Sequence, residues 1–146
     1  MDYWDTSALF KLYAEEPDSE WFSDYLERHP APIYSSAICA IEIPSAAYRQ
    51  LRAKNLNVLA ISEITKRLQI HRDAGRLVHI PCSADVVSQA QRVVILAAGQ
   101  SHPLMIRSLD AIHVASALAI RAKTMIATDI RVRAVARLSG LKLIPS

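Results

Sequence analysis

Four carboxylates stand apart from the other acidic residues because apolar or small residues surround them in the sequence. They are Asp5 in YWDTSAL, Glu42 in AICAIEIP, Asp110 in RSLDAIHVASAL and Asp129 in MIATDIR. Carboxylate oxygens are the ligands that Mg²⁺ prefers, and proteins hold this ion with a few carboxylates plus substrate phosphate. If these side chains meet, they repel one another, and their pKa values rise unless cations are present. The four residues therefore predict a divalent-cation site suited to phosphate chemistry.

Each carboxylate also has a simpler interpretation when it is taken alone. Asp5 and Asp129 each follow a strand and precede a helix, where Asp is a favoured N-cap. Asp110 lies two residues after Ser108, the expected N-cap of its helix, where the helix dipole favours an anion. Glu42 is harder to explain, because few polar residues surround it and a buried carboxylate is costly without a partner. Together the four favour a site more strongly than any one of them does.

The elements that must position these residues follow from short apolar runs that alternate with helical periodicity. The expected strands cover residues 3–4, 33–34, 77–80, 125–127 and 141–144, and the expected helices include residues 37–54, 58–73, 85–98 and 130–139. This alternation predicts an α/β fold: a three-layer α/β/α sandwich with a central parallel sheet of about four to five strands. Ligands bind at the carboxyl ends of the strands in such sheets, so Asp5 and Asp129 belong on that edge. Glu42 and Asp110 can reach it from neighbouring helices.

Composition indicates one soluble domain over residues 1–146. The chain is 51% apolar, which excludes disorder, and its longest apolar stretch is far shorter than a membrane span. Two cysteines cannot form a disulfide framework, and without a signal peptide we expect a cytoplasmic protein. Residues 1–48 carry a net charge of −7 and residues 49–146 a net charge of +10. The basic part suits a polyanionic partner.

Several other residues near the acids have two interpretations each. The hydroxyls of Thr6, Ser7 and Thr128 could contact a metal-bound water or simply serve a helix start. His113 could orient Asp110 from one turn away or be a packed core residue. Arg107 could meet a phosphate or be solvated. The basic residues of two consecutive helices form either a solvated face or a track for a polyanion; they are Arg49, Arg52, Lys54, Lys66, Arg67, Arg72 and Arg76.

Other phosphate-handling classes lack their motifs in this chain. Three glycines cannot supply a Walker loop or a GxGxxG turn. An aspartyl-phosphate enzyme usually needs two acids two residues apart after the first strand, whereas this sequence has Asp5-Thr6-Ser7 there. The five histidines show no zinc-binding spacing.

The motifs around the four acids resemble those of the PIN-domain ribonucleases, specifically the VapC-type toxins of toxin–antitoxin pairs. The opening DTSALFKLYAEEP is similar to the first family motif, with Asp5 as its acid, and Glu42 falls where the family has a helix-borne Glu. The third and fourth motifs are matched by RSLDAIHVASAL, with Asp110, and by ATDIRVRAVARLSGLKLI, with Asp129. The resemblance covers essentially the whole chain and implies a PIN-like fold.

This resemblance implies hydrolysis of RNA that depends on Mg²⁺ or Mn²⁺. Asp5, Asp110 and Asp129 would hold the metal, and Glu42 would orient a metal-bound water or complete the cluster. The implied partners are the RNA substrate, an antitoxin whose tail covers the acidic pocket, and a second copy in a homodimer. Alanine at Asp5 or Asp110 is expected to abolish Mg²⁺-stimulated RNA cleavage and to leave the fold intact. The alternative is a catalytically inactive PIN-like module that binds RNA or protein.

Overall fold

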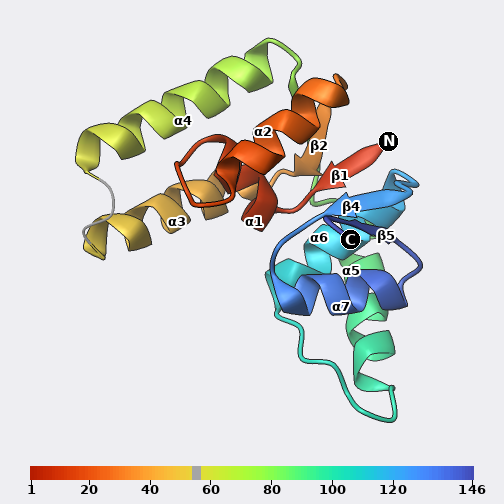
Figure 1. Ribbon diagram of the computed structural model, residues 1–146. Helices are drawn as coiled ribbons and strands as arrows, with labels where there is room; N and C mark the ends of the chain where they lie inside the picture. Colours follow the sequence, from red (N-terminus) through yellow and green to blue (C-terminus); the bar gives the residue numbers. More distant parts are fainter. Residues whose placement is uncertain (54–56) are drawn as a thin grey trace.

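A five-stranded parallel sheet forms the centre of the computed structural model, which describes residues 1–53 and 57–146 (Figure 1). Its strands are β1 (Asp2–Trp4), β2 (Ile33–Ser36), β3 (Leu77–Ile80), β4 (Thr124–Ile126) and β5 (Lys142–Ile144). They lie in the order β3-β2-β1-β4-β5, and every neighbouring pair is parallel. The predicted α/β class and parallel sheet are confirmed.

Helices cover both faces of this sheet. They are α1 (Thr6–Leu9), the 3₁₀ turn η1 (Phe10–Leu12), α2 (Ser19–Arg28), α3 (Cys39–Arg52), α4 (Val58–Asp73), α5 (Ala84–Ala98), α6 (Ser108–Ala119) and α7 (Ile130–Leu138). In Figure 1, α1 to α4 lie on one side of the sheet and α5 to α7 on the other. Side chains alternate along β1, so Tyr3 joins the core beneath α5 to α7 and Trp4 joins the core beneath α1 to α4. The predicted three layers are therefore present.

The strand order reverses between β1 and β4, in the middle of the sheet. Tyr3 pairs with Met125 there, and the backbone N–H of Asp5 donates to the carbonyl oxygen of Ile126 at 2.9 Å. Chain segments diverge on either side of such a reversal, and this leaves a crevice at the carboxyl ends of the two strands. Asp5 and Asp129 flank this crevice.

Two helix starts differ from the sequence-based expectation. Helix α3 begins at Cys39 rather than at residue 37, so Glu42 lies in its first turn and not about two turns in. Pro44 remains inside this helix, and the expected helix end at residue 54 lies outside the described residues. The N-cap of α6 is Arg107 rather than Ser108, because the carboxylate of Asp110 accepts the backbone N–H of Arg107 at 3.3 Å and closes the first turn one residue earlier.

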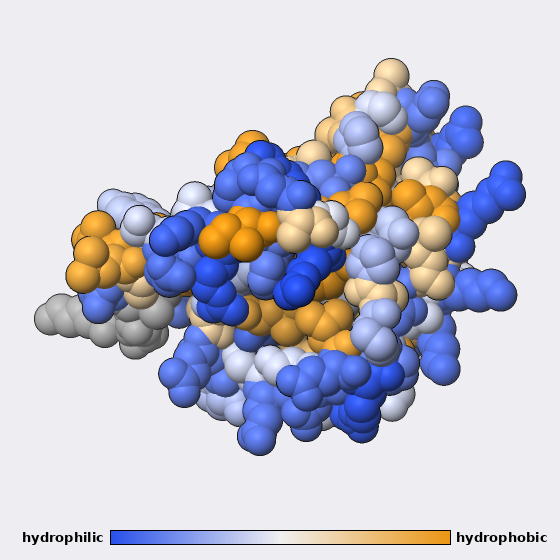
Figure 2. Space-filling model, turned by 90° about the horizontal axis from the view of Figure 1, so that it is seen from above, coloured by the Kyte–Doolittle hydropathy of each residue, from blue (hydrophilic) through white to orange (hydrophobic). Residues whose placement is uncertain are grey.

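The surface mixes polar and apolar side chains. Seen from above the view of Figure 1, hydrophilic residues predominate and hydrophobic ones lie between them (Figure 2). Val58 and Leu59 at the start of α4 are 69% and 80% exposed. In the parts of the chain that the structure describes, no helix combines the length and the apolar character needed to cross a membrane.

Candidate active site

A cleft of about 890 Å³ opens at the carboxyl ends of β1 and β4, and all four predicted carboxylates line it. Asp5 follows β1, Asp129 begins α7, and Glu42 and Asp110 come from the first turns of α3 and α6. Thr6, Ser7, Arg107 and Thr128 line the same cleft. The structure thus brings together residues that are more than a hundred positions apart in the sequence.

Asp5 is buried and only one of its two carboxylate oxygens is anchored. Its Oδ2 accepts hydrogen bonds from the backbone N–H of Ser7 at 3.1 Å and from the Ser7 hydroxyl at 2.5 Å, so Asp5 is also the N-cap of α1. Its Oδ1 accepts no hydrogen bond from the described residues; its neighbour is Nε2 of His113 at 3.7 Å. Burial raises the pKa of Asp5, although His113 and Ser7 act in the opposite direction. Burial therefore disfavours the ionised form of Asp5, and one of its carboxylate oxygens has no hydrogen bond from the described residues.

Glu42, like Asp5, has only one of its two carboxylate oxygens held by hydrogen bonds. Its Oε2 accepts the Thr6 hydroxyl at 2.5 Å and lies 2.6 Å from Nε2 of His113, while Oε1 has no hydrogen bond to any described residue. Burial pushes the pKa of Glu42 upward, but the hydrogen bond and the charge of His113 outweigh it and lower the pKa overall. Glu42 therefore stays ionised and offers one oxygen to the cleft.

Arg107 links the other two acids. Its guanidinium donates to Asp110 Oδ2 at 2.8 Å and Oδ1 at 3.0 Å, and it lies 3.4 Å from Asp129 Oδ2. Asp129 is also the N-cap of α7 and accepts the backbone N–H of Arg131 at 2.8 Å. Burial raises the pKa of Asp129, but the hydrogen bonds and the charge of Arg131 lower it overall. Arg107 is thus a counter-ion to both acids, although its side chain is 60% exposed.

The expected rise in the carboxyl pKa values is wrong for Glu42 and Asp129. The neighbouring side chains of His113 and Arg131 lower the pKa values of these two acids and outweigh the effect of burial. As these side chains stand, no three His, Cys, Asp or Glu residues in residues 1–53 and 57–146 are gathered so that they could hold a metal ion. The guanidinium of Arg107 donates hydrogen bonds to both Asp110 and Asp129.

The donor set nevertheless fits a hard divalent cation. Asp5 and Glu42 line the cleft, and Asp5 Oδ1 and Glu42 Oε1 accept no hydrogen bond from the described residues, so each acid has one oxygen left open for a ligand. Mg²⁺ and Mn²⁺ take such oxygens together with water. Asp110 and Asp129 would also bind the ion if their hydrogen bonds to Arg107 were broken.

The hydroxyl of Ser7 joins the ends of the two central strands. It donates to Asp5 and accepts the backbone N–H groups of Thr128 at 3.0 Å and Asp129 at 3.2 Å. The Ser7 hydroxyl thus serves the start of α1 through Asp5 and also holds the two site loops together, and its contact with a metal-bound water stays a prediction. Thr128 takes part in this link through its backbone N–H.

Removing this link is expected to destabilise the protein. Ser7→Ala leaves two backbone N–H groups without their acceptor, and we expect the free energy of unfolding to fall by about 1–3 kcal/mol. Urea denaturation measures the change. Ser62→Ala, at an exposed position of α4, is the matched control and should stay within about 0.5 kcal/mol of the unchanged protein. Equal stability of the two variants would show that the link contributes nothing.

His113 is a core residue that is also bonded to the site. It is 1% exposed, and its ring contacts Glu42, Thr6 and the hydroxyl of Tyr3. Of the two interpretations of His113, the structure favours the packed core residue: it makes no hydrogen bond to Asp110 among the described residues, and its ring contacts α1 and α3 instead. Burial lowers the pKa of His113, but Asp5 and Glu42 raise it overall. Sequence reasoning missed Tyr3, since a Tyr in a short buried strand carries no signal of its own.

The basic residues of α3 and α4 do not form one continuous free track. Arg49 lines the cleft, but Arg67 turns inward and donates to the backbone carbonyl oxygens of Leu12 at 3.0 Å and Tyr13 at 3.4 Å. Lys54 lies outside the described residues. Arg49 and Arg107 are thus the arginines of the described residues that line the cleft.

Comparison with known proteins assigns the class that this fold and site define. The family model of the PIN domain matches residues 3–138. The chain therefore belongs to the PIN domain family.

Within that family the chain is similar to a ribonuclease VapC. It is 32% identical over 147 residues to Ribonuclease VapC46 of Mycobacterium tuberculosis, and the match covers 97% of this chain and 95% of that protein. A crystal structure of VapBC2 from Rickettsia felis, bound to a DNA fragment from their promoter, contains a chain of the same fold with a TM-score of 0.67. That match is 21% identical and covers 98% of this chain and 97% of the other. The resemblance to VapC-type PIN domains is confirmed.

Proposed function

We propose that this protein is a metal-dependent endoribonuclease and the toxin of a toxin–antitoxin pair in the cytoplasm. The observation that carries the proposal is the convergence of Asp5, Glu42, Asp110 and Asp129 on one cleft, with open oxygens on Asp5 and Glu42. The similarity over nearly the whole length to a protein named a ribonuclease supports RNA as the substrate.

Each residue of the cleft has a role that follows from its geometry. Asp5, Asp110 and Asp129 would hold Mg²⁺ or Mn²⁺, which when bound neutralises phosphate oxygens and lowers the pKa of a bound water. Glu42, kept ionised by His113, accepts a hydrogen bond from the attacking water through Oε1 and takes its proton. Arg107, at the exposed mouth of the cleft, donates to a phosphate oxygen of the RNA.

Two macromolecular partners are part of the proposal. An antitoxin segment that covers the acidic cleft would explain the toxin's control, and the fold-level match to a chain of a VapBC2 complex supports such a partner. A second copy of this chain would form a homodimer, and exposed apolar residues such as Met105 and Ile130, each 80% exposed, offer it surface to bury.

Cleavage of RNA by the purified protein with and without a chelator tests the proposed function. We expect cleavage with Mg²⁺ or Mn²⁺, complete loss in EDTA, and recovery when the ion is restored in excess. Cleavage that persists undiminished in EDTA would contradict the metal requirement. Salt-sensitive RNA binding without cleavage under any ion would instead favour the inactive binding module.

A further inference from the structure

A histidine and a tyrosine lie buried behind Glu42, and neither takes part in the proposed cleavage directly. His113 and Tyr3 are 1% and 0% exposed, in a core otherwise formed by aliphatic residues such as Val114 and Met125. Burying polar groups is costly unless every one of them is hydrogen-bonded. Here the hydrogen bonds form a chain that ends at the cleft.

This chain of hydrogen bonds links residues of β2, β1, α6 and α3. The backbone N–H of Ser36 in β2 donates to the hydroxyl of Tyr3 at 2.9 Å, and this oxygen lies 2.6 Å from Nδ1 of His113. On the other side of the ring, Nε2 lies 2.6 Å from Oε2 of Glu42. The carboxylate can only accept, so Nε2 donates to it, and the hydroxyl of Tyr3 lies against Nδ1.

We propose that Tyr3 and His113 are positioning residues, which fix the carboxylate of Glu42 so that Oε1 points into the cleft. This inference rests on the proposed ribonuclease function and adds two residues to it. A glutamate has three rotatable side-chain bonds, and Thr6 alone could hold Oε2 in more than one orientation. The second bond, from an imidazole that Tyr3 locks in place, leaves one orientation of the carboxylate.

The geometry of the ring pair supports this role. The rings of Tyr3 and His113 meet edge to face, with centroids 5.9 Å apart and an interplanar angle of 69°. Tyr3 lies on β1 two residues before Asp5, so the strand that places Asp5 also places the support of Glu42. The two carboxylates with open oxygens are therefore set by one strand.

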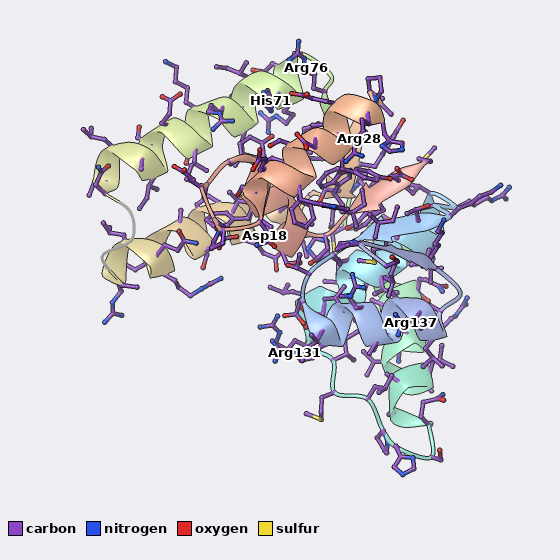
Figure 3. The ribbon with its side chains drawn as sticks, viewed as in Figure 1. Asp18, Arg28, His71, Arg76, Arg131 and Arg137 are labelled. Carbon is purple, nitrogen blue, oxygen red and sulfur yellow. The ribbon has the colours of Figure 1, made fainter. Side chains whose placement is uncertain are left out.

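The chain offers a matched control in a second tyrosine–histidine pair. The hydroxyl of Tyr13 lies 2.9 Å from Nδ1 of His71, and Tyr13 is 5% exposed, so the same kind of contact occurs on α4. Figure 3 shows His71 well away from Arg131, which marks the start of α7 beside the cleft. Tyr13→Phe and His71→Leu remove equivalent groups without touching the cleft.

RNA cleavage kinetics of matched variants test the proposal. We expect His113→Leu to lower kcat by about 100-fold and Tyr3→Phe by about 10-fold, each with KM within about 2-fold, because misplacing a reacting group by an ångström has effects of this size. His113→Gln retains an N–H for Glu42 and should recover part of the loss. The kcat of the double variant Tyr3→Phe/His113→Leu should be no lower than that of His113→Leu alone, because both residues act through the carboxylate of Glu42. Tyr13→Phe and His71→Leu should leave kcat unchanged.

Unchanged kcat in Tyr3→Phe and His113→Leu would overturn the proposal, as would an equal loss in Tyr13→Phe. A readout that needs no catalysis separates this inference from the proposed function. In side-chain ¹⁵N NMR spectra, the signals of His113 should shift in Tyr3→Phe and Glu42→Gln and stay in place in Tyr13→Phe. If the unchanged protein cleaves no RNA, the proposed function fails, and these spectra still show whether the chain of hydrogen bonds exists. If the His113 signals do not shift in Tyr3→Phe, the proposed chain of hydrogen bonds is refuted.

Discussion

Replacing Asp5 by Asn is expected to lower RNA cleavage by at least about 1,000-fold, because charge stabilisation by a bound metal is worth several kcal/mol and each factor of ten needs about 1.4 kcal/mol. Asn still caps α1, since its side-chain oxygen can accept the backbone N–H of Ser7 as Asp5 does. The change therefore removes the charge facing the cleft and keeps the helix start. Single-turnover cleavage of RNA in excess Mg²⁺ measures the effect.

The stability of the same variant separates a functional carboxylate from a structural cap. Burial raises the pKa of Asp5, so the ionised side chain destabilises the folded state at neutral pH. This penalty is absent below the carboxyl's ordinary pKa and grows as the pH rises through the raised value. In EDTA, Asp5→Asn should thus be at least as stable as the unchanged protein at neutral pH. Asp85→Asn, at an exposed position of α5, is the control and should retain full activity. A variant that loses stability but keeps activity would show that Asp5 is only a cap.

Replacing Arg107 by Ala is expected to strengthen Mn²⁺ binding and to weaken RNA binding. The guanidinium holds Asp110 and Asp129, and hydrogen bonds to charged groups are worth about 1.5–3 kcal/mol, so their removal should tighten Mn²⁺ binding by about 10- to 100-fold. The same change should weaken RNA binding, because Arg107 is the proposed donor to phosphate. Calorimetric titration with Mn²⁺ and the KM for RNA report the two effects separately.

Two further variants sharpen the interpretation. Arg107→Lys retains a charge but cannot form the paired hydrogen bonds to Asp110, so it should fall between Ala and Arg in Mn²⁺ affinity. Arg92→Ala, on the exposed side of α5, should change neither quantity beyond a small salt-dependent effect. Weaker Mn²⁺ binding in Arg107→Ala would show that the arginine supports the metal site instead of competing with it.

Much of the architecture follows from local patterns in the sequence. Alternating apolar runs and helical periods predicted the five strands and the parallel sheet. They did so because the apolar residues that a strand buries recur at a different interval along the sequence from those that a helix buries. The same patterns placed Asp5 and Asp129 after neighbouring strands. The start of α3 at Cys39 and the N-cap of α6 at Arg107 were missed; at Arg107 the first turn depends on a hydrogen bond to Asp110 that the sequence does not display.

The roles of the supporting residues depended on tertiary structure. Nothing near Arg107 in the sequence shows that it contacts Asp129, which lies 22 positions away, and nothing near Tyr3 shows that it contacts His113. These contacts arise because β1 and β4 are neighbours in the sheet and α6 packs over them. The balance of charge in the cleft was therefore mispredicted even though its acids were identified.

The sequence by itself determined the class of fold, the family and the four acids, because residue type and periodicity are local properties of the chain. Only the tertiary structure decided which oxygens of Asp5 and Glu42 are open and which arginine holds Asp110 and Asp129. It also decided which buried side chains lie behind Glu42. Those properties depend on distances between segments far apart in the chain, where a shift of an ångström makes or breaks a hydrogen bond.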